Sequence, residues 1–236
     1  MPTTSEHTSK QFDAELEALR ARVLQMGGQV EEQIKLALDA LVSADIDTCD
    51  KVEKNDHLVN ALEVEIDEHV STIIARRQPA AGDLRMLMTV VKTITDLERV
   101  GDEAAKIARM AKLIHSSDRL QSPRMVEIRR MSQIALQMLR KSLDAFARLD
   151  VVASAEVVRE DVHVDDEFRG VIRQLITFMM EDPRTISASL ELLFIAKAIE
   201  RIGDHAKNIS EYVIYMVKGK DVRHVTLEEI EKEVAS

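Results

Sequence analysis

The feature that most constrains this chain is an internal repeat. The motif Glu-Arg-x-Gly-Asp occurs at 98–102 and again at 200–204, and a shift of 102 residues also aligns the residues that follow it. A shift of 105 residues aligns the earlier segments, so that Leu38-Asp39-Ala40 falls on Leu143-Asp144-Ala145. The difference between the two shifts falls near a proline-containing turn, where a change of length disturbs a fold least. The chain therefore contains two copies of one structural unit.

Each copy carries the hydrophobic spacing of α-helices. Apolar residues recur every three or four positions from residue 9 to residue 44, as on the buried face of a helix. Only 7 glycines and 4 prolines are present, too few for the many turns of an all-β fold. We expect helices at about 9–44, 48–78 and 83–115 in the first copy, with Asp47 and Asp83 as N-caps.

The predicted fold is all-α: a tandem duplication of an antiparallel three-helix bundle, with six main helices joined by short connections. The expected segments are a disordered arm, the first repeat, a linker, the second repeat and a charged tail, at 1–8, 9–115, 116–123, 124–218 and 219–236. A short helix is expected in the tail from Thr226.

Charge and cysteine content argue against several classes of protein. The net charge of −10 repels nucleic-acid phosphates and anionic membrane surfaces, so we expect neither as a direct partner. No apolar run is long enough to insert into and span a membrane, and the polar N-terminus does not read as a signal peptide. Cys49 is the single cysteine, which indicates a reducing compartment such as the cytoplasm.

The repeated motif places two acids on one side of a helix. Glu and Asp four residues apart share a face and repel each other, and a glycine in the middle of a helix costs about 1 kcal/mol relative to alanine. Both costs occur twice, which suggests a compensating role such as a close backbone neighbour or room for an ion. On a helical projection, Glu200 and Asp204 point away from the main apolar stripe of the last helix, so we expect them on a surface or in a groove.

Hairpin geometry supplies partners for these acids. Residues equidistant from a turn lie side by side, which brings Asp56 and Asn60 level with the first motif, and Asp161 and Asp165 level with the second. Clustered carboxylates suit Mg²⁺, Mn²⁺ or Fe. The candidate metal ligands are therefore Glu98, Asp102, Asp56 and Asn60 in the first copy, and Glu200, Asp204, Asp161 and Asp165 in the second. The alternative is a solvated acidic face.

One difference between the copies favours the second site. Lys106 stands in the first copy where Asn208 stands in the second, and a lysine would compete with a cation. His205 has Glu103 as its counterpart and is expected at the surface. The Glu160-x-x-His163 spacing of di-iron bundles occurs without the second such motif that they need. No catalytic residues are identified, so the chain is predicted not to be an enzyme.

Several motifs together resemble the PhoU family over nearly the whole chain. They are Asp83-Leu84-Arg85, Leu97 to Asp102, Ala198 to Asp204, Asp56 with Asn60, Arg76-Arg77-Gln78-Pro79, Arg173-Gln174-Leu175 and Val217-Lys218-Gly219. The resemblance, closest to the proteobacterial branch, implies two three-helix bundles in tandem, metal-binding acidic motifs and a homodimer. It implies a negative regulator of phosphate-starvation (Pho regulon) signalling and a modulator of phosphate uptake. Such a protein acts at the cytoplasmic side of the inner membrane with the transporter ATPase PstB and the sensor histidine kinase PhoR.

Three functions remain open from the sequence. The first is a signalling adaptor that docks on a kinase and a phosphate ABC transporter. The second is a carboxylate-rich metal-binding or metal-storage bundle, against which the single Glu-x-x-His motif argues. The third is a structural module for oligomerisation.

Overall fold

The computed structural model describes residues 10–116 and 125–235, and these residues form helices with no strand. The helices of the first repeat are α1 (Lys10–Ser43), α2 (Ile46–Arg77) and α3 (Ala81–Ser116). Those of the second are α4 (Val126–Arg148), α5 (Val151–Glu181) and α6 (Ile186–Lys218), with the 3₁₀ turn Pro183–Thr185 before α6. A last helix, α7 (Leu227–Ala235), follows. The predicted arm at 1–8 and most of the predicted linker lie outside the described residues.

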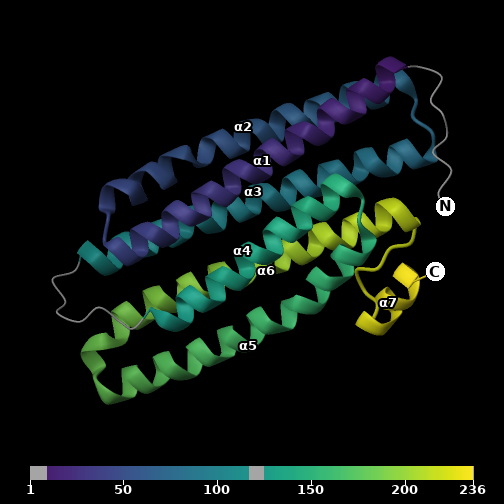
Figure 1. Cartoon of the computed structure of the whole chain (residues 1–236). Helices are drawn as coiled ribbons and strands as arrows, with labels where there is room; N and C mark the ends of the chain where they lie inside the picture. Colours follow the sequence, from purple (N-terminus) through teal and green to yellow (C-terminus); the bar gives the residue numbers. More distant parts are fainter. Residues whose placement is uncertain (1–9, 117–124, 236) are drawn as a thin grey trace.

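The helices form two bundles that lie side by side (Figure 1). Within each repeat all three helices pack on one another, and α3 of the first bundle packs along α6 of the second. Those two helices are antiparallel, because Asp96 contacts Asn208 whereas Glu103, seven residues later, contacts Arg201, seven residues earlier. The predicted all-α tandem duplication is confirmed.

Two predicted helix starts are wrong in detail. Asp45, not Asp47, caps α2: its carboxylate accepts a hydrogen bond from the backbone N–H of Thr48 at 3.0 Å. Asp150 caps α5 in the same way, so the cap belongs to the repeat. Asp47 already lies in the first turn of α2, where its negative charge interacts favourably with the helix dipole although it does not cap the helix. Asp83 likewise lies inside α3, which begins at Ala81.

One hydrophobic core runs through both repeats, because the central helices α3 and α6 are buried on more than one side. The outer helix α2 buries a single stripe, formed by Cys49, Val52, Val59, Ile66, Val70 and Ile73. None of the helices in the described ranges is long and apolar enough to cross a membrane.

The predicted tail helix is present as α7. Thr226 and Glu229 form a capping box: the backbone N–H of Thr226 donates to Glu229 Oε2 at 3.0 Å, and the N–H of Glu229 donates to Thr226 Oγ1 at 3.4 Å. Together with Ala155, Val158, Ile214 and Val222, Ile230 forms a second, smaller hydrophobic cluster.

Candidate functional site

The first acidic motif meets the predicted partners from α2. Burial, followed by the charge of Asp102, raises the pKa of Asp56. Burial, followed by the charges of Asp102, Glu63 and Asp56, raises the pKa of Glu98. A Cβ atom at Gly101, within the motif on α3, would be 3.7 Å from Asp56 Oδ1, so Asp56 of α2 lies beside the motif, as hairpin geometry predicts. We call Glu98, Asp102, Asp56 and Asn60 the first acidic cluster.

Several oxygen atoms around this cluster have no hydrogen-bond partner. Asp56 Oδ1, Asn60 Oδ1 and Gln33 Oε1 are each shielded from solvent and unpaired. Buried polar atoms are normally satisfied, so each such atom calls for an explanation such as a water or an ion. Gln33, which reaches the cluster from α1, is not among the residues predicted from the sequence; its place on the buried stripe of α1 is the signal that could have identified it.

Gly101 lies beside these oxygens. A Cβ atom at this position would be 3.4 Å from Val59 Cγ1 and 3.7 Å from both Asp56 Oδ1 and Gln33 Oε1. Its close neighbours are side chains, so the glycine is not required for the approach of a neighbouring backbone. The space that it leaves open is the space between two unpaired oxygens.

The second acidic motif also meets its predicted partners, but lysines neutralise them. Lys197 Nζ donates to both oxygens of Glu200, at 2.6 and 2.5 Å. Lys207 Nζ donates to Asp161 Oδ2 at 2.7 Å. We call Glu200, Asp204, Asp161 and Asp165 the second acidic cluster.

Asp204 is the most perturbed carboxyl of the second cluster. Burial, followed by the charges of Glu200 and Asp161, raises its pKa to about 6, while Lys197 opposes the shift. Asp165 also contributes to the rise, so all three of the other predicted residues raise the pKa of Asp204. Asp161 is almost fully buried and the other three residues are half-buried, so this cluster is only partly open to solvent.

The side chains stand too far apart to enclose an ion as they are placed. Within residues 10–116 and 125–235, no three His, Cys, Asp or Glu side chains converge in the way a metal ion requires. The donor set of the first cluster nevertheless fits a hard divalent cation, because it offers unpaired carboxylate and amide oxygens. The second cluster fits less well, since two of its carboxylates already bond to lysines. Lys106, expected to compete at the first site, instead donates to Glu103 at 3.2 Å.

The expectation that His205 lies at the surface is wrong. His205 is 5% exposed, and its Nδ1 donates to Asp96 Oδ1 at 2.6 Å across the contact between α6 and α3. The amide of Asn208 donates to the same oxygen at 3.2 Å. The counterpart used to place it, Glu103, is itself buried, and its carboxylate pairs with Arg201 at 3.1 Å.

These polar contacts join the two repeats, and the sequence carries a signal for them. Asp96 and Glu103 belong to a second stripe of α3 with helical spacing, formed by Thr89, Thr93, Asp96, Val100, Glu103 and Ile107, and all six are buried. A helix with two buried stripes is a central helix with neighbours on both sides.

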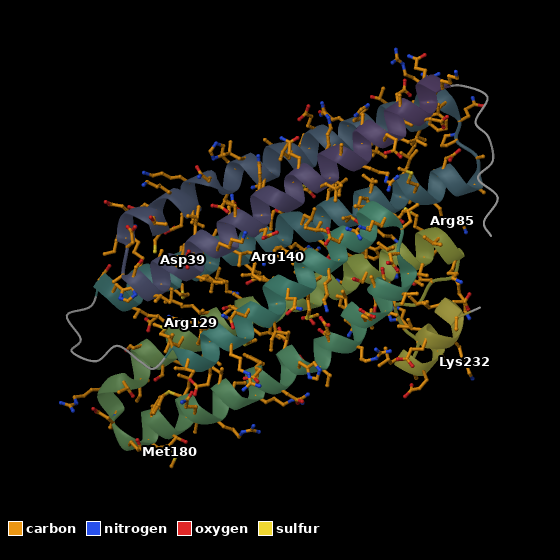
Figure 2. The ribbon with its side chains drawn as sticks, viewed as in Figure 1. Asp39, Arg85, Arg129, Arg140, Met180 and Lys232 are labelled. Atoms are coloured by element: carbon orange, nitrogen blue, oxygen red, sulfur yellow. The ribbon has the colours of Figure 1, made fainter. Side chains whose placement is uncertain are left out.

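Figure 2 shows the side chains of the described residues on all the helices.

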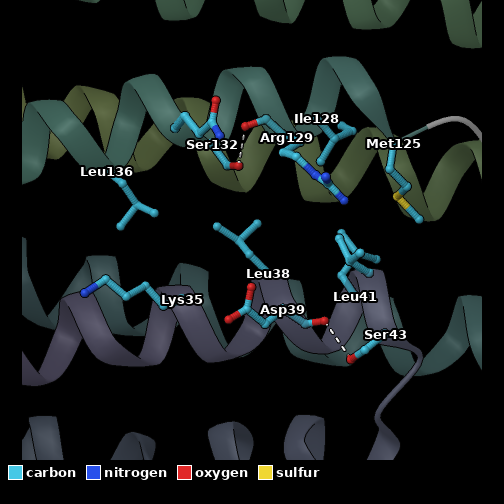
Figure 3. A pocket seen from close by; sticks show the side chains of 12 residues that line it. Lys35, Leu38, Asp39, Leu41, Ser43, Met125, Ile128, Arg129, Ser132 and Leu136 are labelled. Carbon is cyan, nitrogen blue, oxygen red and sulfur yellow. Dashed lines mark hydrogen bonds between the residues drawn. The ribbon is translucent and has the colours of Figure 1, made fainter.

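A cleft of about 620 Å³ lies elsewhere, between α1 and α4. It contains no residue of either acidic cluster; its lining includes Leu38, Leu41, Met125, Ile128 and Leu136. Figure 3 shows Leu38 of α1 and Leu136 of α4 pointing into the gap between the two helices. At the other end of this seam the helices close, because Leu143 packs directly on Gly27.

The sequence matches known proteins over almost its whole length. The family model described as the PhoU domain matches twice, at residues 23–111 and 128–213. The chain is 46% identical over 231 residues to the phosphate-specific transport system accessory protein PhoU of Escherichia coli (strain K12), covering 98% of this chain and 95% of that protein.

Solved structures show the same fold. The crystal structure of PhoU from Pseudomonas aeruginosa superimposes with a TM-score of 0.85 at 45% identity, covering 89% of this chain and 100% of that one. The phosphate transport system regulatory protein PhoU from Streptococcus pneumoniae superimposes with a TM-score of 0.82 at 28% identity, covering 89% and 99%. Both matched regions of the family model lie in the two helical repeats, and the chain belongs to the PhoU family.

Proposed function

We propose that this protein regulates phosphate transport and signalling as a binding protein and is not an enzyme. The observation that carries the proposal is the near-full-length similarity to proteins named phosphate-specific transport system accessory proteins. The similarity covers 98% of the chain, so it includes both helical repeats.

In this proposal the protein is an adaptor between the phosphate ABC transporter and a sensor histidine kinase. It binds the transporter ATPase PstB and the kinase PhoR at the cytoplasmic side of the membrane, and it represses phosphate-starvation signalling when phosphate is plentiful. The two repeats support this role because they offer two related but unequal surfaces, one for each partner. A homodimer would present both surfaces twice.

A reporter strain tests the proposal. In a host that lacks its own PhoU protein, a reporter of the phosphate-starvation response should be active even in phosphate-rich medium. Expression of this chain should restore repression, and the ATPase and the kinase should each co-purify with it from membranes. Unchanged reporter activity at normal protein levels would contradict the regulatory role, whereas repression without either partner would contradict the adaptor role.

A second candidate role, metal binding, rests on the unpaired oxygens of the first acidic cluster. We propose that Asp56, Asp102, Glu98 and Asn60 hold a divalent cation of Mg, Mn or Fe, and that the second cluster holds one more weakly. Such a cation would supply positive charge between carboxylates that otherwise repel one another.

A further inference from the structure

The short helix α7 covers an apolar patch on the second repeat. Ile230 is 2% exposed and packs with Ala155 and Val158 of α5 and Ile214 of α6. We call Ala155, Val158 and Ile214 the α7 pad. The pad belongs to a hydrophobic cluster separate from the main core, and Figure 1 shows α7 at one end of the second bundle.

The first repeat has no such patch at the equivalent positions. The shifts that align the two repeats place Asp50 on Ala155, Glu53 on Val158 and Lys112 on Ile214. In the first repeat Asp50 and Lys112 form an ion pair at the surface. A three-helix unit of this kind therefore folds with charges at all three positions. The three-helix bundle does not need the apolar pad in order to fold, so the role of the pad is to bind the helix that covers it.

The bound helix defines the chemistry that the pad accepts. Along α7, Leu227, Ile230 and Val234 recur at helical spacing on one face, and four glutamates occupy other positions: Glu228, Glu229, Glu231 and Glu233. Arg159 of α5, at the edge of the pad, complements them: its Nε donates to Glu231 Oε1 at 3.1 Å. Lys220, in the connection that leads from α6 to α7, donates from its Nζ to Glu233 Oε2 at 2.7 Å. An apolar patch with an arginine at its edge suits an acidic amphipathic helix.

Few contacts hold α7 in place. It has 9 residues, fewer than an isolated helix needs for stability in water, and only Ile230 within it is fully buried. Its ion pair to Arg159 of α5 and its ion pair to Lys220 in the preceding connection both lie at the surface, where such pairs contribute little. Elements with few buried contacts open locally without global unfolding.

We propose that the α7 pad is a docking surface for an acidic amphipathic helix of a partner protein, and that α7 occupies it until that helix displaces it. This inference does not depend on the role in phosphate signalling. It commits to a protein helix as the occupant, and it makes the pad a site at which a partner could be exchanged for the chain's own tail.

Two labelled peptides test the proposal in the full-length chain. One has the sequence of residues 226–236; the other is unrelated but keeps Leu, Ile and Val at the same spacing with glutamates between them. Ile230→Asp removes the buried anchor of α7 and should free the pad. Both peptides should bind this variant at least about tenfold more tightly than wild type, because the binding-competent state is no longer rare. Fluorescence anisotropy measures both affinities.

Matched variants separate docking from general effects. Ala235→Asp adds the same charge to an exposed position of α7 and should leave peptide binding as in wild type. Adding Val158→Glu to Ile230→Asp should abolish binding, since it installs the residue of the first repeat, Glu53, in the pad. Circular dichroism verifies that this double variant is folded; if it is not, Ala155→Asp, which installs the equivalent of Asp50, replaces Val158→Glu.

Four results would overturn the proposal. The first is that neither peptide binds Ile230→Asp, and the second is that binding survives in the pad variants. The third is that only the peptide with the chain's own sequence binds, which would make α7 a dedicated internal cap. The fourth is a wild-type dimer that Val158→Glu abolishes in analytical ultracentrifugation, which would make a second copy the occupant.

Discussion

In the first repeat Lys106 bonds to Glu103 rather than to a residue of the first acidic cluster. In the second repeat Lys197 and Lys207 each bond to a carboxylate of the second acidic cluster. The two clusters have the same motif and lie on equivalent pairs of helices, at a similar distance from the turn that joins each pair. They differ in how many of their carboxylates bond to lysines, and oxygen atoms without a hydrogen-bond partner remain around the first cluster. Equivalent backbone positions therefore do not imply equivalent sites.

The same lesson applies to the contact between the repeats and to the tail. Asp96 and His205 bond across the contact, yet their repeat equivalents are Ala198 and Glu103, which cannot form the same bond. The α7 pad is apolar in one repeat and charged in the other. The two repeats have the same helices. They differ in the side chains at the contact between the repeats and at the α7 pad.

The largest expected effect concerns metal binding by the two clusters. A cation that binds only the folded state stabilises it by about 2.7 kcal/mol at a hundredfold excess over its Kd. Thermal unfolding of wild type with Mn²⁺ or Mg²⁺ should show this shift. Glu98→Gln with Asp102→Asn should remove most of it, whereas Glu200→Gln with Asp204→Asn should remove less.

The metal-free protein provides a control for the second cluster. The pKa of Asp204 is raised to about 6, so between its ordinary value and pH 6 the folded state binds more protons than the unfolded state. The contribution of Asp204 to stability is therefore lost as the pH rises through this window. Glu200→Gln with Asp204→Asn should preserve or raise metal-free stability above pH 6. If the thermal unfolding of wild type does not shift with metal, neither cluster binds a cation. If the two double variants lose equal parts of the shift, the clusters do not differ in metal binding.

The next effect concerns the asymmetric contact between the repeats. Asp96→Ala leaves the buried Nδ1 of His205 and the amide of Asn208 without their acceptor, so the free energy of unfolding should fall by about 2 kcal/mol. His163→Ala, at an exposed position of α5, is the matched control and should change it by less than about 0.5 kcal/mol. Urea denaturation measures both. A loss as small as that of His163→Ala would show that the buried bond does not stabilise the pairing of the bundles.

Much of the fold follows from the sequence because it depends on spacing. The apolar period defines the helices, the shifts define the duplication, and the Thr226 to Glu229 pattern marks the start of α7. The N-caps are harder to predict, because Asp45 and Asp47 are equally suitable by type and only the backbone shows which carboxylate reaches the free N–H groups.

The sequence predicts which residues the candidate site contains, but not which of its carboxylates bond to lysines. Hairpin geometry brings Asp56 and Asp161 to the motifs: Asp56 lies beside Gly101, and Asp161 bonds to Lys207, three residues after Asp204. It cannot say where a flexible lysine points, so the sequence predicts Lys106 at the first cluster although its amine bonds to Glu103 instead. The sequence misplaces His205 because its counterpart, the acidic Glu103, suggests a surface position, whereas both side chains are buried and each pairs with a residue across the contact between α3 and α6.

The smallest expected effect distinguishes the two motif glycines. A Cβ atom would make only ordinary contacts at either position: 3.4 Å to Val59 at Gly101, and 3.4 Å to Val164 at Gly203. Gly101→Ala and Gly203→Ala should therefore each stabilise the metal-free protein by up to about 1 kcal/mol, the difference in helix propensity. At Gly203 the new methyl group meets a valine, so the Mn²⁺-dependent shift should stay as in wild type. At Gly101 it enters the space between the oxygens of Asp56 and Gln33, so the shift should shrink. Thermal unfolding of both variants with and without Mn²⁺ measures the contrast, and equal responses would mean that Gly101 does not keep that space open for an ion.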